Sequence, residues 1–282
     1  MKPLEVGLLF WAGGALGEEK PPAEIVESVV SLGVRCGQLG LHGEADLGAA
    51  SRSLWQTAIS ANSLTVVTAV VSFSGESYAD VEAVERTVGY LPPATRAERE
   101  QRTFAVSDFA AELSIPGLAA HIGALPEDPR DSDYVAIRDL VRRICDRCAN
   151  HGQTFALETG QEPAEALRQF ILDVDRSNLG VNFDPANMVL YGSGEPMSAL
   201  ETVRDWVISV HCKDGVAPTE PGQLGSETPL GQGEVGMERY VSKLSAIGYR
   251  GPLVIEREIV GEAQHADIRH AVALLNQLRQ SV

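Results

Sequence analysis

Cysteines and aromatic residues are scarce in this 282-residue chain, with four cysteines in all and 6% Phe, Trp and Tyr. The cysteine spacing matches neither a disulfide framework nor a zinc ribbon, so we expect reduced thiols in a cytoplasmic protein. One C-x-x-C pair, Cys145 and Cys148, lies within a helical pattern, which favours packing over a redox or metal role. The other two cysteines are Cys36 and Cys212.

Basic residues are also in deficit, because 23 Lys and Arg stand against 39 Asp and Glu, for a net charge of -16. Such a surface repels nucleic acid phosphates and anionic membranes, so neither is an expected partner. The sequence lacks the roughly 20 consecutive apolar residues that a membrane span needs. The first 17 residues include an apolar stretch, but Glu5 and the fit of 4–10 to a strand argue against a signal peptide.

Short apolar runs alternate with amphipathic segments along the whole chain. The expected strands lie near 4–10, 34–39, 64–73, 118–122, 153–158, 179–183, 207–211 and 252–257. The expected helices lie near 22–32, 46–62, 78–113, 132–150, 162–176, 195–204, 236–247 and 262–280. Eight alternating units predict α/β architecture, namely one (β/α)8 TIM barrel over residues 1–282.

Proline and glycine positions add a helix break and two loops to this prediction. Pro92 and Pro93 divide the segment 78–113 into two helices, because proline interrupts the backbone hydrogen bonds of a helix. The Pro- and Gly-rich stretches 123–130 and 215–233 are predicted to be loops. No domain boundary is evident.

Four of the apolar runs end in, or next to, a residue type that binds metals. The ends of barrel strands gather on one face, where three carboxylates would repel one another without a cation. We therefore predict a metal site rather than four separate helix caps or surface charges. Glu258 shares a strand face with Glu256 and is an alternative ligand, although Glu256 is preferred. The predicted metal ligands are Glu158, Asp184, His211 and Glu256.

The residues around these ligands form recognisable motifs: Asp184-Pro185-Ala186-Asn187, His211-Cys212-Lys213-Asp214, Pro229-Leu230-Gly231-Gln232-Gly233-Glu234 and Ile255-Glu256-Arg257-Glu258. With them the whole chain resembles the xylose isomerase-like barrel superfamily, which includes D-tagatose and D-psicose 3-epimerases, inosose dehydratases, hydroxypyruvate isomerases and endonuclease IV. The resemblance implies a Glu, Asp, His, Glu metal site at the four positions above. Its ligand set is compatible with Mn²⁺, Mg²⁺ or Co²⁺, with Zn²⁺ also possible.

The resemblance also implies an activity, that of a metal-dependent isomerase or epimerase acting on a small sugar or polyol-like carbonyl compound. Glu158 and Glu256 would be the catalytic acid/base pair that moves a proton through an enediolate. An inosose dehydratase-like lyase and a non-catalytic metal- or sugar-binding barrel are the alternatives. The oligomeric state is left open.

Two departures from the family pattern argue against an endonuclease IV-like enzyme, and the first of them also argues against a close identity with the epimerases. Asn187 stands where epimerases and endonuclease IV commonly place a histidine. The nuclease's Asp-x-His is replaced here by Gly225-Ser226-Glu227. The glycine-rich segment 231–236 formally matches a dinucleotide fingerprint, but it follows a loop instead of a strand, so nicotinamide binding is not expected.

The candidates for substrate binding each have a structural alternative. Asn187 would bind a hydroxyl or cap a helix, and Lys213 would contact a substrate oxygen or pair with a carboxylate. His121 would line the pocket or pack at the core edge, and Glu234 would face the pocket or cap the helix near 236. Aromatic walls are the remaining candidates, with loop packing as their alternative: Trp11 and Phe73.

Overall fold

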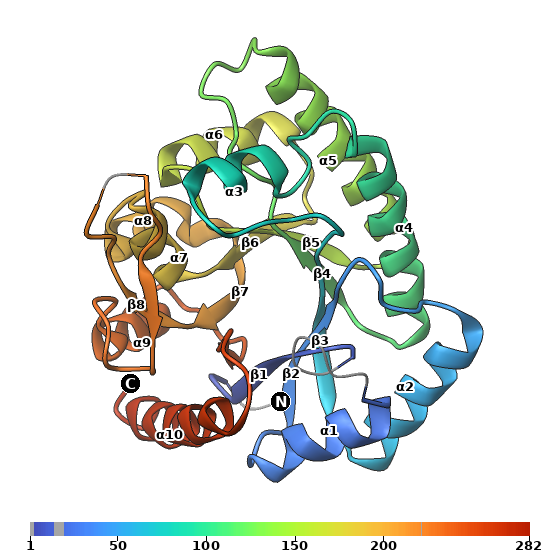
Figure 1. The fold of residues 1–282 in the computed structure, drawn as a ribbon, viewed down its shortest axis with the longest axis vertical. Helices are drawn as coiled ribbons and strands as arrows, with labels where there is room; N and C mark the ends of the chain where they lie inside the picture. Colours follow the sequence, from blue (N-terminus) through green and yellow to red (C-terminus); the bar gives the residue numbers. More distant parts are fainter. Residues whose placement is uncertain (1–2, 14–19, 221) are drawn as a thin grey trace.

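Eight parallel strands close into a barrel in the computed structural model, which describes residues 3–13, 20–220 and 222–282 (Figure 1). Their order around the barrel is β1-β10-β7-β6-β5-β4-β3-β2, so the predicted (β/α)8 fold is confirmed. The barrel strands are β1 (Val6–Trp11), β2 (Cys36–Leu41), β3 (Thr65–Val71), β4 (Gly117–Ala120), β5 (Thr154–Glu158), β6 (Leu179–Phe183), β7 (Val207–Cys212) and β10 (Leu253–Ile255).

Helices surround the barrel on the outside (Figure 1). The longer ones are α1 (Pro22–Ser31), α2 (Ala49–Ala61), α4 (Arg96–Glu112), α5 (Ser132–Asn150), α6 (Ala164–Val174), α8 (Pro196–Val203), α9 (Met237–Ala246) and α10 (Glu262–Leu278). A short α3 (Val81–Thr87) precedes α4, which confirms the predicted break at the prolines. The described helices include none that is long and apolar enough to cross a membrane.

Four short elements differ from the prediction. The helix α7 (Pro185–Tyr191) follows β6 directly, and a 3-10 turn, η1 (Arg204–Trp206), precedes β7. The stretch 215–233, predicted as a loop, contains β9 (Ser226–Thr228), which pairs antiparallel with β8 (Asp214–Val216). Each strand of this hairpin has only three residues, too few for a period-two pattern to be visible in sequence.

The apolar core has two parts. The larger part fills the space between barrel and helices, where side chains such as Phe155 and Val181 are fully buried. The smaller part lies inside the barrel and consists of Leu9, Val70, Ala119, Ala156 and Val254. Two of these five are alanines, and small side chains leave room inside the barrel beneath the strand ends.

Candidate metal centre

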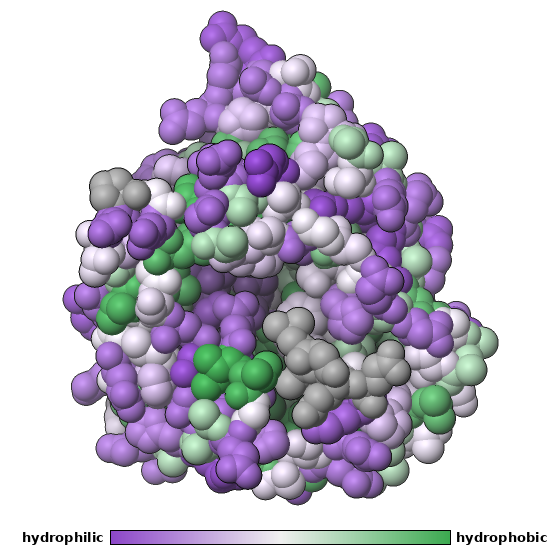
Figure 2. Space-filling model, viewed as in Figure 1, coloured by the Kyte–Doolittle hydropathy of each residue, from purple (hydrophilic) through white to green (hydrophobic). Residues whose placement is uncertain are grey.

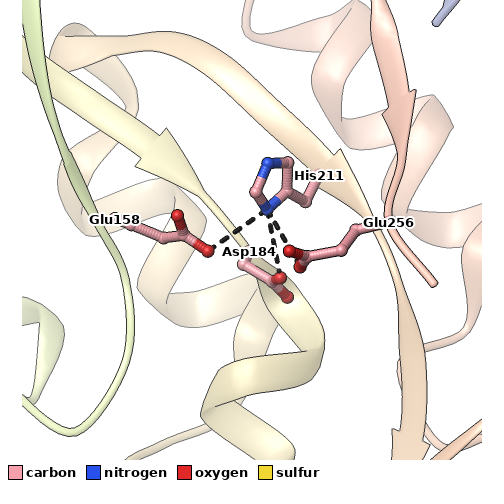
Figure 3. Close-up of side chains that lie close together, drawn as sticks. All are labelled: Glu158, Asp184, His211 and Glu256. Atoms are coloured by element: carbon pink, nitrogen blue, oxygen red, sulfur yellow. Dashed lines mark hydrogen bonds and ion pairs between the residues drawn. The ribbon is translucent and has the colours of Figure 1, made fainter. Parts of the chain in front are cut away.

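Four side chains from adjacent strands converge at one end of the barrel (Figure 3). Glu158 is the last residue of β5, Asp184 follows β6, His211 lies in β7, and Glu256 follows β10. One potential ligand atom of each lies within 4.8 Å of those of the other three. The four residues are buried, with exposed fractions of 0 to 8%. The structure thus brings together the whole predicted ligand set.

His211 lies between the three carboxylates. Its Nδ1 is 3.2 Å from an oxygen of Glu158, 3.3 Å from one of Asp184 and 3.2 Å from one of Glu256. Its Nε2 lies 2.8 Å from the side-chain oxygen of Gln38, to which it donates a hydrogen bond. In the neutral imidazole this bond places the proton on Nε2 and leaves the Nδ1 lone pair facing the carboxylates, the arrangement usual for a histidine ligand.

The charges of the cluster act on the protonation of His211. Burial lowers the pKa of His211, but Glu256 and Glu158 raise it more, so this pKa lies well above its ordinary value. The protonated imidazole therefore offsets part of the negative charge. A divalent ion would supply that charge instead and would displace the proton, because a histidine ligand must be neutral.

The three carboxyl groups are held in their charged form. Burial raises the pKa of Glu158, but His121 and His211 lower it by more, so this pKa lies below its ordinary value. For Glu256 the raising effect of burial is outweighed by Lys213 and then by His211. Burial is likewise outweighed at Asp184, by the hydrogen bond from His211 and the charge of Lys213. Ionised carboxylates are the form that binds a hard divalent cation.

Lys213 connects this cluster to the rim of the barrel. It is 2% exposed, and its Nζ lies 3.1 Å from Glu256 and 2.6 Å from Glu258. The side chain of Glu258 is 58% exposed and lies outside the four-residue cluster. The geometry therefore favours Glu256 over Glu258 as the fourth ligand. Lys213 pairs with carboxylates, one of the two roles predicted for it.

Asn187 is buried beside the ligands. Its backbone N–H and that of Ala186 donate to Asp184, which is the N-cap residue of α7, so the capping role considered for Asn187 belongs to Asp184. The Asn187 side-chain amide donates to the backbone oxygen of Thr159 at 3.2 Å and to Glu158 at 3.4 Å. Asn187 thereby orients a ligand and a loop at the site.

His121 and Trp11 border the interior of the barrel near the cluster. The Nε2 of His121, directly after β4, lies 3.4 Å from Glu158, and the side chain is 18% exposed. His121 therefore lies beside the cluster, and its contact with a substrate stays a prediction. Trp11 ends β1 and packs against the residues inside the barrel. Its ring covers Gly40, where a Cβ would lie 2.4 Å from the indole.

Phe73 and Glu234 are engaged elsewhere. Phe73 is 6% exposed and packs edge-on against Tyr90, with ring centroids 5.1 Å apart, as the loop-packing alternative describes. Glu234 is exposed, and its carboxylate accepts a hydrogen bond from the backbone N–H of Ala217. The alternative role of Glu234 as a helix cap is wrong, because α9 begins after Gly236 without any side-chain cap bond. The preferred role, in the pocket, stays a prediction. Glu234 instead fixes the backbone beyond β8.

A second layer of buried polar residues lies behind His211 and was not predicted. Gln38, Asn182 and Ser209 come from β2, β6 and β7, and are at most 6% exposed. The Ser209 hydroxyl donates to the side-chain oxygen of Asn182 at 2.6 Å, and Gln38 donates to the same oxygen at 3.3 Å. The available signal was a polar residue in the middle of an apolar strand, at positions 38 and 182.

Asp214, within the predicted motif but given no role there, organises the glycine-rich loop. It is 1% exposed and accepts hydrogen bonds from the backbone N–H groups of Gly231, Gly233 and Val235, and from that of Gly215. At Gly233 a Cβ would lie 2.2 Å from the Asp214 carboxylate, so a larger residue would displace the loop. The motif therefore serves to fix this loop around a carboxylate.

Glu162, in the loop between β5 and α6, is another buried carboxyl group that sequence gave no reason to single out. It is 5% exposed, and its Oε1 has no hydrogen-bond partner in the part of the chain that the structure describes. Burial raises the pKa of Glu162 to about 7. It lies close enough to His121 for the imidazole to oppose that rise.

Figure 2 shows a hollow at the centre of this face, bordered by hydrophilic residues on one side and by a strongly hydrophobic group on another. The buried anionic cluster itself is suited to a divalent metal ion.

The model of a family described as xylose isomerase-like TIM barrel matches residues 26–278. A xylose isomerase domain protein from Planctomyces limnophilus is 38% identical in sequence and superimposes with a TM-score of 0.93, over 99% of each chain. The chain also matches uncharacterized proteins of Escherichia coli and Methanocaldococcus jannaschii, 30 and 25% identical, and spans 32 and 55% of their lengths.

Two more distant structures share the fold. A D-tagatose 3-epimerase-like protein is 18% identical with a TM-score of 0.73, over 100% of this chain and 99% of the other. A xylose isomerase-like TIM barrel protein from Mycobacterium smegmatis, in complex with magnesium, is 16% identical with a TM-score of 0.72, over 100% and 97%.

Proposed function

The chain belongs to the xylose isomerase-like TIM barrel family, and we propose that it is a divalent-metal-dependent isomerase or epimerase of a small sugar or related polyhydroxy carbonyl compound. The observation that carries this proposal is the buried convergence of Glu158, Asp184, His211 and Glu256. The epimerase-like and magnesium-containing structures of the same fold support it. The cytoplasmic location expected from sequence stays a prediction.

The cluster fits a hard divalent ion by its donor chemistry, because three carboxylates and one imidazole nitrogen are ligands that Mg²⁺, Mn²⁺ and Co²⁺ accept. Bound there, such an ion would polarise the substrate carbonyl and offset the negative charge of the enediolate. Zn²⁺ is compatible with the same set.

Proton transfer falls to Glu158 and Glu256, which reach the cluster from β5 and from the end of β10. The pKa of each carboxyl group lies below its ordinary value, so either can take a proton from a carbon atom held between them. The other, once it has gained a proton from solvent, can donate that proton to the opposite face. His121 beside Glu158, and Lys213 beside Glu256, stabilise these charges.

We assign the binding and orientation of the substrate to polar side chains that border the four-residue cluster. We assign hydroxyl and carbonyl contacts to Lys213, Asn187 and His121, whose side chains border the ligands. Trp11 would offer its ring to the apolar face of the sugar. Phe73 and Glu234 are not included, because their side chains are engaged in packing and in the hairpin backbone.

The test is exchange of carbon-bound hydrogen in D₂O, followed by NMR on a panel of ketoses and aldoses with Mg²⁺, Mn²⁺ or Co²⁺. We expect exchange that chelation abolishes and added metal restores, and that Glu158→Gln and Glu256→Gln each remove. Glu165→Gln, at an exposed position of α6, is the matched control.

Three results would contradict the proposal. Undiminished exchange in Glu158→Gln would remove the acid/base assignment. Loss of water from the sugar, seen by mass spectrometry, would identify the dehydratase-type lyase instead. Calorimetric binding of a sugar without exchange under any of the three metals would identify a binding protein.

A further inference from the structure

A groove with a volume of about 850 Å³ lies at the rim of the barrel, outside the four-residue cluster. One wall is the segment 78–85, which enters α3, and the other is 222–225 in the β8–β9 hairpin. Figure 1 shows α3 and this hairpin beside the same part of the barrel opening. Ligand pockets commonly measure about 300 to 1,000 Å³, so this rim groove has room for a separate chemical group.

Tyr78 joins the rim groove to the candidate metal centre. It lines the groove, is 44% exposed, and its ring centroid lies 6.2 Å from that of His121. His121 in turn lies 3.4 Å from Glu158. A ligand that begins at the cluster and extends past His121 therefore meets the Tyr78 ring and then the groove.

The walls of the rim groove are preformed by hydrogen bonds. The side chain of Asp80 caps α3 through the N–H of Ala83 at 2.8 Å. The N–H of Val81 donates to the backbone oxygen of Gly222 across the groove at 3.4 Å. On the other side, Gly225 donates to the backbone oxygen of Leu190 in α7. A preformed site loses less conformational entropy when it binds a ligand.

The lining disfavours anionic groups and offers acceptors to hydroxyls. Its charged members are Asp80, Glu82 and Glu85, and none of the described residues that line it is Lys or Arg. Among the described residues Glu82 pairs with Arg86, 3.8 Å away on the exposed face of α3, and such an exposed pair is weak. Carboxylates accept hydrogen bonds from hydroxyls and repel phosphates, while a tyrosine ring packs on the apolar face of a sugar.

We propose that the rim groove is a subsite for a second sugar ring, so that the substrate is a glycoside or disaccharide whose carbonyl-bearing unit lies at the metal cluster. This inference rests on the proposed function for the carbonyl-bearing unit. The second ring would stack on Tyr78 and donate hydrogen bonds to the carboxylates of the segment 78–85.

The test compares D-fructose with three glucosyl-fructoses that differ in linkage, turanose, maltulose and isomaltulose, on the full chain with Mg²⁺. Calorimetry gives Kd, and NMR in D₂O gives carbon-bound hydrogen exchange. We expect at least one disaccharide to bind about tenfold or more tighter than fructose. Leu224→Trp, which places a larger side chain in the groove, and Tyr78→Ala should remove that gain.

Two controls separate the subsite from general damage to the fold. Tyr78→Phe keeps the ring and should keep the gain, and Leu54→Trp, at an exposed position of α2, should change nothing. Equal Kd for all four sugars, or retention of the gain in Leu224→Trp, would overturn the subsite.

The readouts also distinguish the subsite from the proposed function. Exchange of fructose hydrogen with no gain from the second ring overturns the subsite alone. A tighter, Leu224-dependent disaccharide complex without exchange of any sugar overturns the isomerase assignment and leaves the subsite standing. Absence of both binding and exchange overturns both.

Discussion

Gln38 and His211 lie on strands β2 and β7, 173 positions apart in sequence, and their side chains meet inside the barrel with 2.8 Å between the Gln38 oxygen and His211 Nε2. With the Asn182 amide nitrogen, 3.2 Å from the same Nε2, this contact leaves Nδ1 facing Glu158, Asp184 and Glu256. Removal of such outer partners commonly weakens metal binding about 10- to 100-fold.

Replacement of this acceptor should therefore weaken the metal site without touching a ligand. We expect Gln38→Leu to raise the Kd for Mn²⁺ by about 10-fold or more, because the imidazole is no longer held in one tautomer and orientation. Calorimetric titration of the metal-free protein gives the Kd. Gln277→Leu, at an exposed position of α10, is the control, and an unchanged Kd in Gln38→Leu would show that the contact has no part in metal binding.

Metal binding should release a proton from His211, whose pKa in the metal-free protein lies well above its ordinary value. Below that raised pKa, the apparent Kd should fall by about tenfold for each unit of rising pH, because one proton leaves as the ion binds. Titration in two buffers with different ionisation heats counts the protons. A Kd independent of pH from about 6 to 8, with no proton released, would contradict the prediction.

The same group links stability to pH in the metal-free protein. A folded-state pKa raised above that of the unfolded chain stabilises the fold fully below the unfolded value, and this contribution is lost as the pH rises through the folded value. Saturating Mg²⁺ should remove that dependence. Melting curves of the metal-free and metal-bound protein across this pH range measure the difference.

Glu162 should destabilise the fold at alkaline pH. Its pKa rises from 4.5 to about 7 on folding, so the stability decreases as the pH rises from the lower value to the upper one. Glu162→Gln keeps the shape of the side chain without its charge, and should raise the free energy of unfolding at about pH 8 by on the order of 3 kcal/mol.

Denaturant titration of Glu162→Gln at about pH 5 and pH 8 tests this, with Glu165→Gln as control. Equal effects at both pH values would contradict the prediction.

Asp214→Ala should loosen the glycine-rich loop. The loss of a carboxylate that accepts four backbone hydrogen bonds should lower the free energy of unfolding by about 2 to 4 kcal/mol. Thermal unfolding gives the loss, and amide hydrogen exchange should locate it at residues 231–235. Asp214→Asn should lose less, because its amide oxygen still accepts. Unchanged exchange at these amides would show that the loop is held by other contacts.

Much of the fold and the four-residue cluster could be predicted from local sequence patterns. Apolar runs and helical periodicity are short-range, so the barrel strands and the break before α4 were readable without contacts. Glu158, Asp184, His211 and Glu256 were recognisable because charge at the end of a buried strand is costly unless it has a function. The hairpin of β8 and β9 was not readable, since its pairing depends on residues ten or more positions apart.

By itself the sequence determined the alternation of strands and helices, and hence the strand ends where ligands gather, because both follow from local periodicity. Only the tertiary structure decided which side chains meet there. Closure of the barrel brought Gln38 to His211, turned Glu256 inward and left Glu258 exposed, and set Tyr78 beside His121. These contacts depend on strand register, loop path and packing over long separations, which no local pattern encodes.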